Sequence, residues 1–407
     1  MRLSSIIKFL ACSTLLMTCH SYATQYKLLP DDGKATDHFG FSVAIDGTTA
    51  LIGAYKADAK NVPDSGAAYV YSLGSAGWEQ QAKLVAEPAH ADDTLGGNVA
   101  LKNHMAMLGV RNRDDKGADA GAVFAFERKA NSWSQTQILT AIDAKPGDAF
   151  GQSIALTERF LVIGAPHSDS PDKDTGSAYV YIRDKNTWQF QGKLTAKDGA
   201  AGDLFGISVA IDGDTILVGA DLNDEKAENA GAVYVFVFDG KQWGQQAKLM
   251  AEDGANTDIF GVRVALLGDT ALISARRDDI EDVGVDVGSA YIFERIKNKW
   301  IQTQKLVAPD GETDDRFGRG VALNNEIALI TAMQDDTNGT DTGALYVFKK
   351  QQGQWQLISK VVASDGAIED RFGWNVALSG KNAIVASPLR DDNGNASGAA
   401  YIQNLSD

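Results

Sequence analysis

The chain has 407 residues, including 41 glycines and eight prolines, and carries a formal net charge of −16. Hydrophobic residues make up 44% of it, which excludes a disordered chain. The negative charge argues against a nucleic-acid partner, because phosphates would be repelled. A glycine-rich chain with many turns favours an all-β fold.

The first 23 residues have the pattern of a secretory signal peptide. Arg2 and Lys8 supply positive charge, an apolar run follows, and Ser-Tyr-Ala suits cleavage after Ala23. The apolar run is too short to cross a bilayer, so we expect no transmembrane segment. Both cysteines, Cys12 and Cys19, lie in this segment. We therefore expect export to the periplasm or beyond the cell without disulfides, or alternatively a lipid anchor at Cys19, although the lipoprotein-box match is poor.

From residue 24 onward, one unit of about 55 residues recurs seven times. The first marker is Phe-Gly, which Leu95-Gly96 replaces in the second copy; its phenylalanines are Phe39, Phe150, Phe205, Phe260, Phe317 and Phe372. The second is a glycine before an aromatic stretch: Gly66, Gly121, Gly176, Gly231, Gly288, Gly343 and Gly398. The third is a lone tryptophan: Trp78, Trp133, Trp188, Trp243, Trp300 and Trp355. Three markers in one register predict a single repeat domain, 24–407.

Each copy is predicted to form four short antiparallel strands. In the fourth copy, alternation and Asp-Gly turns predict strands over 206–211, 215–220, 231–238 and 242–251. Four strands without a helix are typical of a propeller blade. The blades are predicted at about 30–86, 87–141, 142–196, 197–251, 252–308, 309–363 and 364–407 with 24–29.

The two ends of the chain predict a closed ring. The last copy stops after its third strand, and residues 25–28 (Gln-Tyr-Lys-Leu) match the end of the fourth strand elsewhere, as in residues 81–84 (Gln-Ala-Lys-Leu). The N-terminal segment is therefore expected to complete the last blade, which removes free sheet edges. We expect a monomeric, seven-bladed ring.

Phe-Gly at the start of each copy, with Gly164-Ala165-Pro166 after a second strand, resembles the FG-GAP repeat. This family is known from the propeller of integrin α subunits and from many exported bacterial proteins. The resemblance covers the mature chain and implies an all-β, seven-bladed propeller, a fold that serves many functions. Integrin-like blades often bind Ca²⁺ through a D-x-D-x-D-G loop between the first two strands. Here that link is only a turn, as at Asp212-Gly213, so the family's calcium site is not carried over.

Acidic residues gather in the two sets of loops that blade topology places on one face. These loops hold 42 of the 54 acidic residues and 15 of the 38 Lys and Arg residues, a net charge of −27. Such a face attracts cations or basic partners. The candidate Ca²⁺ ligands in these loops are Asp169, Asp172, Asp174, Asp335, Asp336 and Asp341. The alternative for the repeated Asp-Gly…Asp-x-Phe-Gly pattern is turn chemistry, in which Asp accepts local backbone N–H groups.

Three sets of residues are candidates for partner binding. The six Phe-Gly phenylalanines either fill the space between blades or, as the resemblance implies, form a rim that receives a partner's side chain. Arg263, Arg319 and Trp374 depart from the repeat on the innermost strand, either because they point into the channel or by drift. The outer tryptophans either cover blade edges or stack on sugars.

Signals for an enzyme are few. The mature chain has four histidines and no cysteine, and it lacks familiar catalytic motifs. We predict no catalytic residue and no required cofactor. The predicted function is a non-catalytic exported binding or adhesion module, which recognises a protein or glycan through its acidic loop face with Ca²⁺ as an optional ligand. The alternative is a hydrolase or lyase with a site over the central channel.

Overall fold

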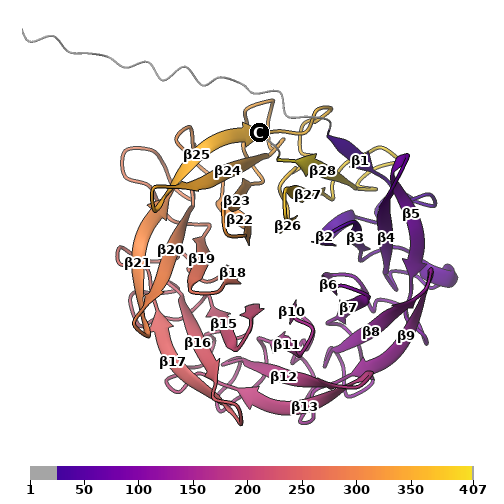
Figure 1. The fold of residues 1–407 in the computed structure, drawn as a ribbon, viewed down its shortest axis with the longest axis horizontal. Helices are drawn as coiled ribbons and strands as arrows, with labels where there is room; N and C mark the ends of the chain where they lie inside the picture. The colour runs from indigo at the N-terminus through magenta and orange to yellow at the C-terminus, as the bar shows by residue number, and fades with distance from the viewer. Residues whose placement is uncertain (1–24, 406–407) are drawn as a thin grey trace, which may run out of the picture.

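Seven four-stranded antiparallel sheets surround a central channel in the computed structural model, which describes residues 25–405 (Figure 1). The predicted all-β, seven-bladed propeller is confirmed. The predicted signal peptide, residues 1–23, lies outside the described residues. Within residues 25–405 the only helical segment is the short 3₁₀ turn η1 (Ala59–Asn61), and no helix there is long and apolar enough to cross a membrane.

Each blade runs from the channel outward in chain order. The innermost strands are β2 (Phe39–Asp46), β6 (Asn98–Lys102), β10 (Ser153–Leu156), β14 (Ser208–Asp212), β18 (Arg263–Leu267), β22 (Phe317–Leu323) and β26 (Val376–Ser379). The second strands are β3 (Thr49–Ala54), β7 (Met105–Val110), β11 (Phe160–Ala165), β15 (Thr215–Ala220), β19 (Thr270–Ala275), β23 (Ile327–Ala332) and β27 (Asn382–Ser387). The third strands are β4 (Ala67–Gly74), β8 (Ala122–Lys129), β12 (Ser177–Asp184), β16 (Ala232–Phe238), β20 (Ser289–Ile296), β24 (Ala344–Gln351) and β28 (Ala399–Asn404). The outermost strands are β5 (Gly77–Leu84), β9 (Ser132–Leu139), β13 (Thr187–Leu194), β17 (Trp243–Leu249), β21 (Lys299–Leu306), β25 (Gln354–Val361) and β1 (Tyr26–Leu28).

The ring closes as the two chain ends predict. Strand β1, at the N-terminal end, pairs antiparallel with β28, and Tyr26, Lys27 and Leu28 lie opposite Ile402, Tyr401 and Ala400. The seventh blade therefore takes its outermost strand from the other end of the chain (Figure 1). Because β1 covers β28, the seventh blade has no free third strand. A free strand at this position would be an exposed sheet edge that could pair with another chain.

The repeated glycines and phenylalanines mark where neighbouring blades meet. The glycine that precedes each third strand lies against the next blade's Phe-Gly backbone: a Cβ on Gly66 would lie 2.2 Å from the Leu95 carbonyl oxygen, and one on Gly343 would lie 1.9 Å from that of Phe372. The backbone N–H of Phe372 donates to the Thr342 carbonyl at 2.9 Å, which joins the same two blades. The repeated glycines are therefore explained by contacts between blades, because only a residue without a side chain fits at these positions.

The phenylalanine rings of the motif form the core between blades. All six are fully buried, and Phe39 packs edge-to-face on Tyr69 and Tyr71 with ring centroids 5.5 and 6.1 Å apart. The same geometry recurs in the other blades, as for Phe150 on Tyr179. The predicted channel rim of Phe39, Phe150, Phe205, Phe260, Phe317 and Phe372 is therefore wrong, and the alternative, packing between blades, is confirmed. The rings lie between the blades because an aromatic side chain is buried there, whereas it would be exposed to water in the channel.

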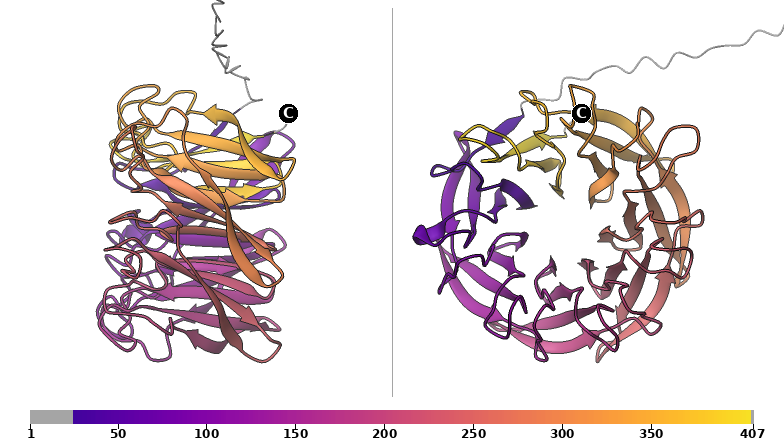
Figure 2. Two further views of the ribbon diagram at one scale, coloured as in Figure 1. Left: turned by 90° about the vertical axis from the view of Figure 1, so that its left-hand side faces the viewer. Right: turned by 180° about the vertical axis from the view of Figure 1, so that it is seen from behind.

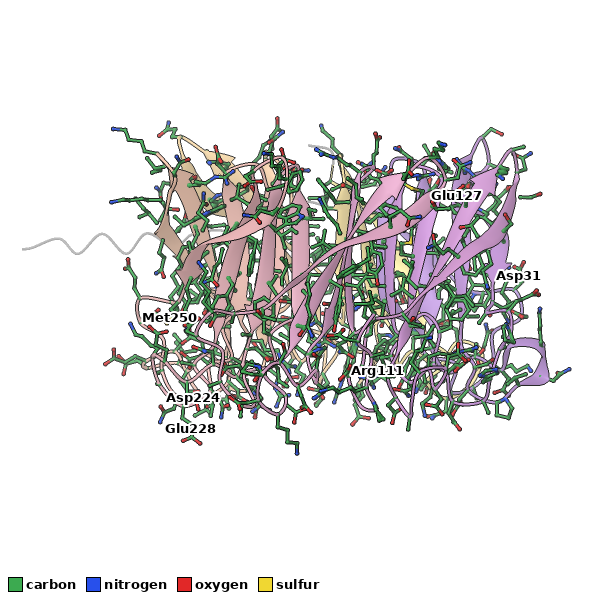
Figure 3. The ribbon with its side chains drawn as sticks, turned by 90° about the horizontal axis from the view of Figure 1, so that it is seen from below. Asp31, Arg111, Glu127, Asp224, Glu228 and Met250 are labelled. Carbon is green, nitrogen blue, oxygen red and sulfur yellow. The ribbon has the colours of Figure 1, made fainter. Side chains whose placement is uncertain are left out.

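The long loops all emerge on one face of the ring, and the tight turns emerge on the other (Figure 2). Asp224, Glu228 and Arg111 from these loops lie on one side of the ring, whereas Glu127, near a tight turn, lies on the opposite side (Figure 3). We call the first side the loop face.

The second aspartate of each Asp-Gly…Asp-x-Phe-Gly loop is a structural residue. It is buried in every blade and accepts the backbone N–H of the residue three positions earlier, as Asp93 does from His90 at 2.8 Å and Asp203 from Ala200 at 2.9 Å. The seven residues are Asp37, Asp93, Asp148, Asp203, Asp258, Asp315 and Asp370. The interpretation of this pattern as turn chemistry is therefore confirmed.

One of these aspartates gives a pH-dependent prediction. Burial raises the pKa of Asp315 to about 7; the Glu312 N–H opposes this shift and the charge of Asp335 adds to it. Asp315 in the folded protein therefore holds a proton between about pH 4 and 7 that the unfolded chain has released, so folding stability should fall as pH rises through this window. Asp315→Asn keeps the acceptor and removes the charge. We expect it to unfold at higher urea concentration than the wild type at pH 8, with the difference shrinking toward pH 5; a difference that is constant with pH would contradict this.

Candidate ligand site at the mouth of the central channel

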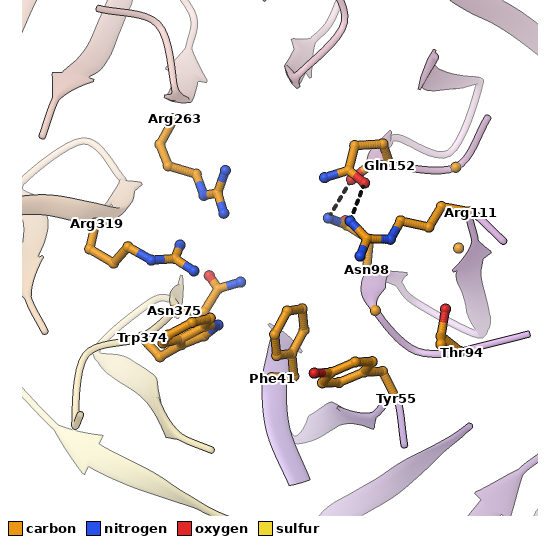
Figure 4. A pocket seen from close by; sticks show the side chains of 13 residues that line it. Phe41, Tyr55, Thr94, Asn98, Arg111, Gln152, Arg263, Arg319, Trp374 and Asn375 are labelled. Atoms are coloured by element: carbon orange, nitrogen blue, oxygen red, sulfur yellow. Dashed lines mark hydrogen bonds between the residues drawn. The ribbon is translucent and has the colours of Figure 1, made fainter. Parts of the chain in front are cut away.

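A pocket of about 190 Å³ opens in the channel at its loop-face end (Figure 4). It takes residues from every blade except the fourth, and so depends on closure of the ring. Its side chains are those of Phe41, Tyr55, Thr94, Asn98, Arg111, Gln152, Arg263, Arg319, Trp374 and Asn375, with Gly97, Gly109 and Gly151 between them. The structure thus brings together Arg263, Arg319 and Trp374, the three residues that depart from the repeat.

Arg263 occupies a position that has a different use in other blades. In the first, third and fourth blades this position is a serine whose hydroxyl donates to the next blade's Phe-Gly glycine carbonyl, as Ser208 does to Gly261 at 2.6 Å. In the fifth blade, Arg263 replaces that serine, and its register partner is Ser274 where the first four blades have glycine. The fifth blade therefore lacks the hydrogen bond from a serine hydroxyl to the next blade, and it places a guanidinium in the channel instead.

Arg319 is the most isolated cation of the pocket. Its side chain is 8% exposed, and its guanidinium lies over the Trp374 ring, 4.2 Å from the centroid. Its Nε has no hydrogen-bond partner within the described protein. Burial, and then repulsion from Arg263, Arg276 and Arg371, lowers the pKa of Arg319 well below its ordinary value. Since a guanidinium remains charged in proteins, this positive charge is only weakly compensated.

The acidic residue that acts on Arg263 and Arg276 is Asp221, which follows strand β15. It is buried, and its Oδ1 has no hydrogen-bond partner within the described protein. Burial raises the pKa of Asp221 to about 6, against the opposing charges of Arg276 and Arg263. One carboxylate therefore acts on two arginines of the fifth blade, Arg263 and Arg276, and Arg319 of the sixth blade has no such counter-charge among the described residues.

An aromatic wall stands beside the arginines (Figure 4). Phe41 lies between Tyr55 and Trp374, with ring centroids 4.2 and 5.4 Å away. His38 stacks behind Tyr55 at 5.4 Å. All three pocket rings are only partly buried, so they present apolar surface to a ligand.

The opposite wall is polar. Arg111 donates to the Gln152 side-chain oxygen at 3.1 Å, and the Asn98 amide donates to the Gln152 carbonyl at 3.0 Å (Figure 4). Asn375 lies next to the arginines and Trp374 in the same view. Three amides, three guanidiniums and three aromatic rings thus surround one space. Among the residues the structure describes, the lining contains no Asp, Glu, His, Lys or Cys.

If Arg319 binds a ligand, its buried charge should lower the free energy of unfolding of the ligand-free protein. We therefore expect Arg319→Met to raise the free energy of unfolding by about 1–3 kcal/mol, because it removes a desolvated and repelled charge while filling similar volume. Urea unfolding measures this. A loss of stability would show that Arg319 is a structural residue.

The six candidate calcium ligands do not form a cation site. Asp169 and Asp336 accept loop N–H groups from Asp174 and Asp341 at 3.2 and 2.7 Å. Asp335 accepts the Tyr346 hydroxyl and pairs with Lys360 at 2.6 Å. Asp174 pairs with His167, Asp341 pairs with Arg371, and Asp172 lies in the same loop as Asp169 and Asp174. Within residues 25–405, no three acidic, histidine or cysteine side chains are placed to hold a metal ion. These residues do not fit Ca²⁺.

Many loop carboxylates are neutralised inside the protein. The aspartate of the Asp-Gly pair accepts a tyrosine hydroxyl from the third strand and pairs with a lysine from the outermost strand, as Asp32 does with Tyr69 at 2.8 Å and Lys83 at 2.6 Å. The outer-strand lysines that pair with the aspartate at this loop position are Lys27, Lys83, Lys193, Lys248, Lys305 and Lys360. The loop face is therefore less negative than its loop sequences predict.

The outer tryptophans pack against neighbouring side chains and are buried or half-buried. None of the six is exposed, and basic side chains cover several of them, as Arg295 covers Trp300 at 5.2 Å. This geometry favours the structural role over sugar stacking at the outer edge.

The sequence analysis did not single out Tyr55 and Arg111, which line the pocket, or Arg276 and Arg371, whose charges act on Arg319. Tyr55, Arg111 and Arg276 share one position, directly after the second strand, which is proline in the third and seventh copies. Arg371 precedes the Phe-Gly motif, as Arg316 does in the sixth copy, where the other copies have His38, Thr94 or an aliphatic residue. A comparison of the copies position by position would have found both columns.

The fold is a seven-bladed propeller, and this pocket is the candidate ligand site in its channel. The model of the FG-GAP repeat matches residues 22–71, 78–126, 133–181, 188–236, 243–293, 300–348 and 355–403. The chain therefore belongs to the FG-GAP repeat family, a family of binding modules. Each match begins near the outermost strand of one blade and ends in the third strand of the next, so the sequence repeat is offset from the blade by one strand.

Similarity to solved structures is limited to shape. A chain from a crystal structure of the mitotic checkpoint complex is 11% identical, with a TM-score of 0.56 and coverage of 100% of both chains. A chain from the crystal structure of Saccharomyces cerevisiae Sqt1 is 9% identical, with a TM-score of 0.49 and coverage of 95% of this chain and 99% of that one. At such identity the first shows the fold alone. A search of the curated proteins found no match.

Proposed function

We propose that the protein is an exported, non-catalytic binding module whose protein or glycan ligand enters the channel from the loop face. The observation that carries this proposal is the weakly compensated guanidinium of Arg319, buried against Trp374 in an asymmetric pocket. An unpaired buried charge lowers stability, so its retention at a pocket supports a role in recognition.

The pocket lining supports binding rather than acid–base chemistry. Its ionisable groups are the three arginines and Tyr55, and an arginine is a poor proton donor or acceptor at neutral pH. The hydrolase or lyase alternative would need an acidic group at the pocket, and Asp221 is the carboxylate that interacts with the pocket residue Arg263. Asp221 is buried beside the pocket and does not line it.

Retention from an envelope extract tests the proposal. Immobilised wild-type protein, Arg319→Gln and Trp374→Ala should be compared with Arg159→Gln, which changes an exposed arginine in a tight turn on the opposite face. We expect a component that the wild type and Arg159→Gln retain and that both channel variants release. Equal retention by all four folded proteins would place the contact outside the channel and overturn the proposal.

A further inference from the structure

The channel pocket combines features that match one chemical class of ligand. Resting on the proposed function, we propose that the channel recognises an acidic sugar unit, with its carboxylate or sulfate on Arg263 and Arg319 and its ring against Trp374 and Phe41. Each part of this assignment follows from a different wall of the pocket.

The acidic group is assigned from the arginine wall. Arg319 has an unpartnered Nε, and Arg263 donates one Nη1 bond to the Val262 carbonyl, which leaves its other donors for a ligand. Both guanidiniums point into the same space (Figure 4). A guanidinium fork matches the paired oxygens of a carboxylate or sulfate, and such charge-assisted bonds are the stronger ones in proteins. A neutral ligand would leave these groups desolvated and unpaired.

The ring is assigned from the aromatic wall and the amides. Trp374, Phe41 and Tyr55 form a partly buried surface that suits the apolar C–H face of a sugar ring. Asn98, Gln152 and Asn375 supply the amide donors and acceptors that hydroxyl groups require. Such a mixture of apolar surface and a few placed polar groups is typical of small-molecule sites.

The pocket has room for about one sugar unit. Its volume of about 190 Å³ equals roughly six waters at their share of about 30 Å³ each in the liquid, which is close to a single sugar ring. The acidic loops that surround the mouth repel an extended polyanion. A terminal acidic unit, presented singly at the end of a glycan, therefore fits better than a densely charged chain.

Calorimetric titration at low salt with two matched series of three sugars tests the assignment. The probes are galactose, galacturonate and galactose 6-sulfate, with the corresponding glucose series, and acetate as an anion without a ring. We expect at least one acidic sugar to bind about tenfold or more tightly than its neutral counterpart and than acetate. The uronate and sulfate arms separate the two acidic groups.

Variants then assign the contacts. Arg319→Gln and Trp374→Ala should each weaken binding of the acidic sugar about tenfold or more, and Arg159→Gln should leave it unchanged. Equal binding of neutral and acidic sugars, or no binding of acidic sugars up to about 10 mM, would overturn the assignment. If the acidic sugars fail while both channel variants still release the envelope component, the ligand class is wrong and the proposed function stands. If the variants retain that component, both proposals fail.

Discussion

Gly343→Ala should prevent stable folding, whereas Gly353→Ala should be tolerated. Both glycines have the same left-handed backbone, with φ of +82° and +84°. A Cβ on Gly343 would lie 1.9 Å from the Phe372 carbonyl oxygen and 2.9 Å from its carbon and nitrogen, whereas a Cβ on Gly353 meets nothing within 4 Å. The neighbours of Gly343 are backbone atoms of the next blade, so relief requires two blades to separate.

The matched pair isolates the contact between blades from backbone strain. Both variants carry a left-handed alanine, which costs about 1–2 kcal/mol. We expect Gly353→Ala to lose only that amount, and Gly343→Ala to lose more than about 4 kcal/mol or to be insoluble. Thermal and urea unfolding measure the difference. Losses of similar size would show that the glycine marker serves backbone conformation alone.

Arg113→Met should cost about 3–5 kcal/mol, because it leaves a buried carboxylate unpaired. Arg113 is 1% exposed, pairs with the buried Asp93 at 2.6 Å and with Asp115 at 2.8 Å, and lies over the Phe124 ring. The second blade has Phe124 and Ile138 where other blades have the tyrosine and lysine of the repeated network, as Tyr179 and Lys193 in the third. A cation from the loop replaces the one missing from the outer strand.

Two comparison proteins make this prediction specific. Arg128→Met changes a half-buried arginine that covers Trp133 in the same blade, and it should cost less than about 1 kcal/mol. Adding Asp93→Asn to Arg113→Met should recover part of the loss, since asparagine keeps an acceptor for the His90 N–H and removes the charge. A double variant no more stable than the single one would argue that packing, rather than charge, makes Arg113 important.

The fold was predictable because each marker repeats a contact that every blade needs. In the fourth blade, β15 has the predicted bounds, and the other three strands lie within two residues of theirs. Closure by residues 25–28 was predictable because the last copy lacks a fourth strand, whereas the N-terminal segment has the sequence pattern of one. The orientation of the phenylalanines was not, since a strand pattern alternates between faces without saying which face meets the neighbouring blade.

The site was only partly predictable because it is built from departures from the repeat. Arg263 stood out against the serines of its column, and Arg319 and Trp374 stood out in a column that elsewhere includes Phe41, Gln152 and Ile207. Arg276 and Arg371 lie in charged loops, where one more arginine resembles ordinary surface charge. Only the folded ring shows that these loops place arginines from different blades close enough to repel one another.

The most direct test of ligand binding in the channel is a crystal structure of the protein with the component eluted from the envelope extract. The account predicts that the ligand occupies the pocket at the loop-face mouth, with an acidic group bonded to Arg319 and a ring or apolar surface on Trp374. A ligand bound to the outer strands or to the acidic loop tips, with the channel pocket holding only water, would contradict it.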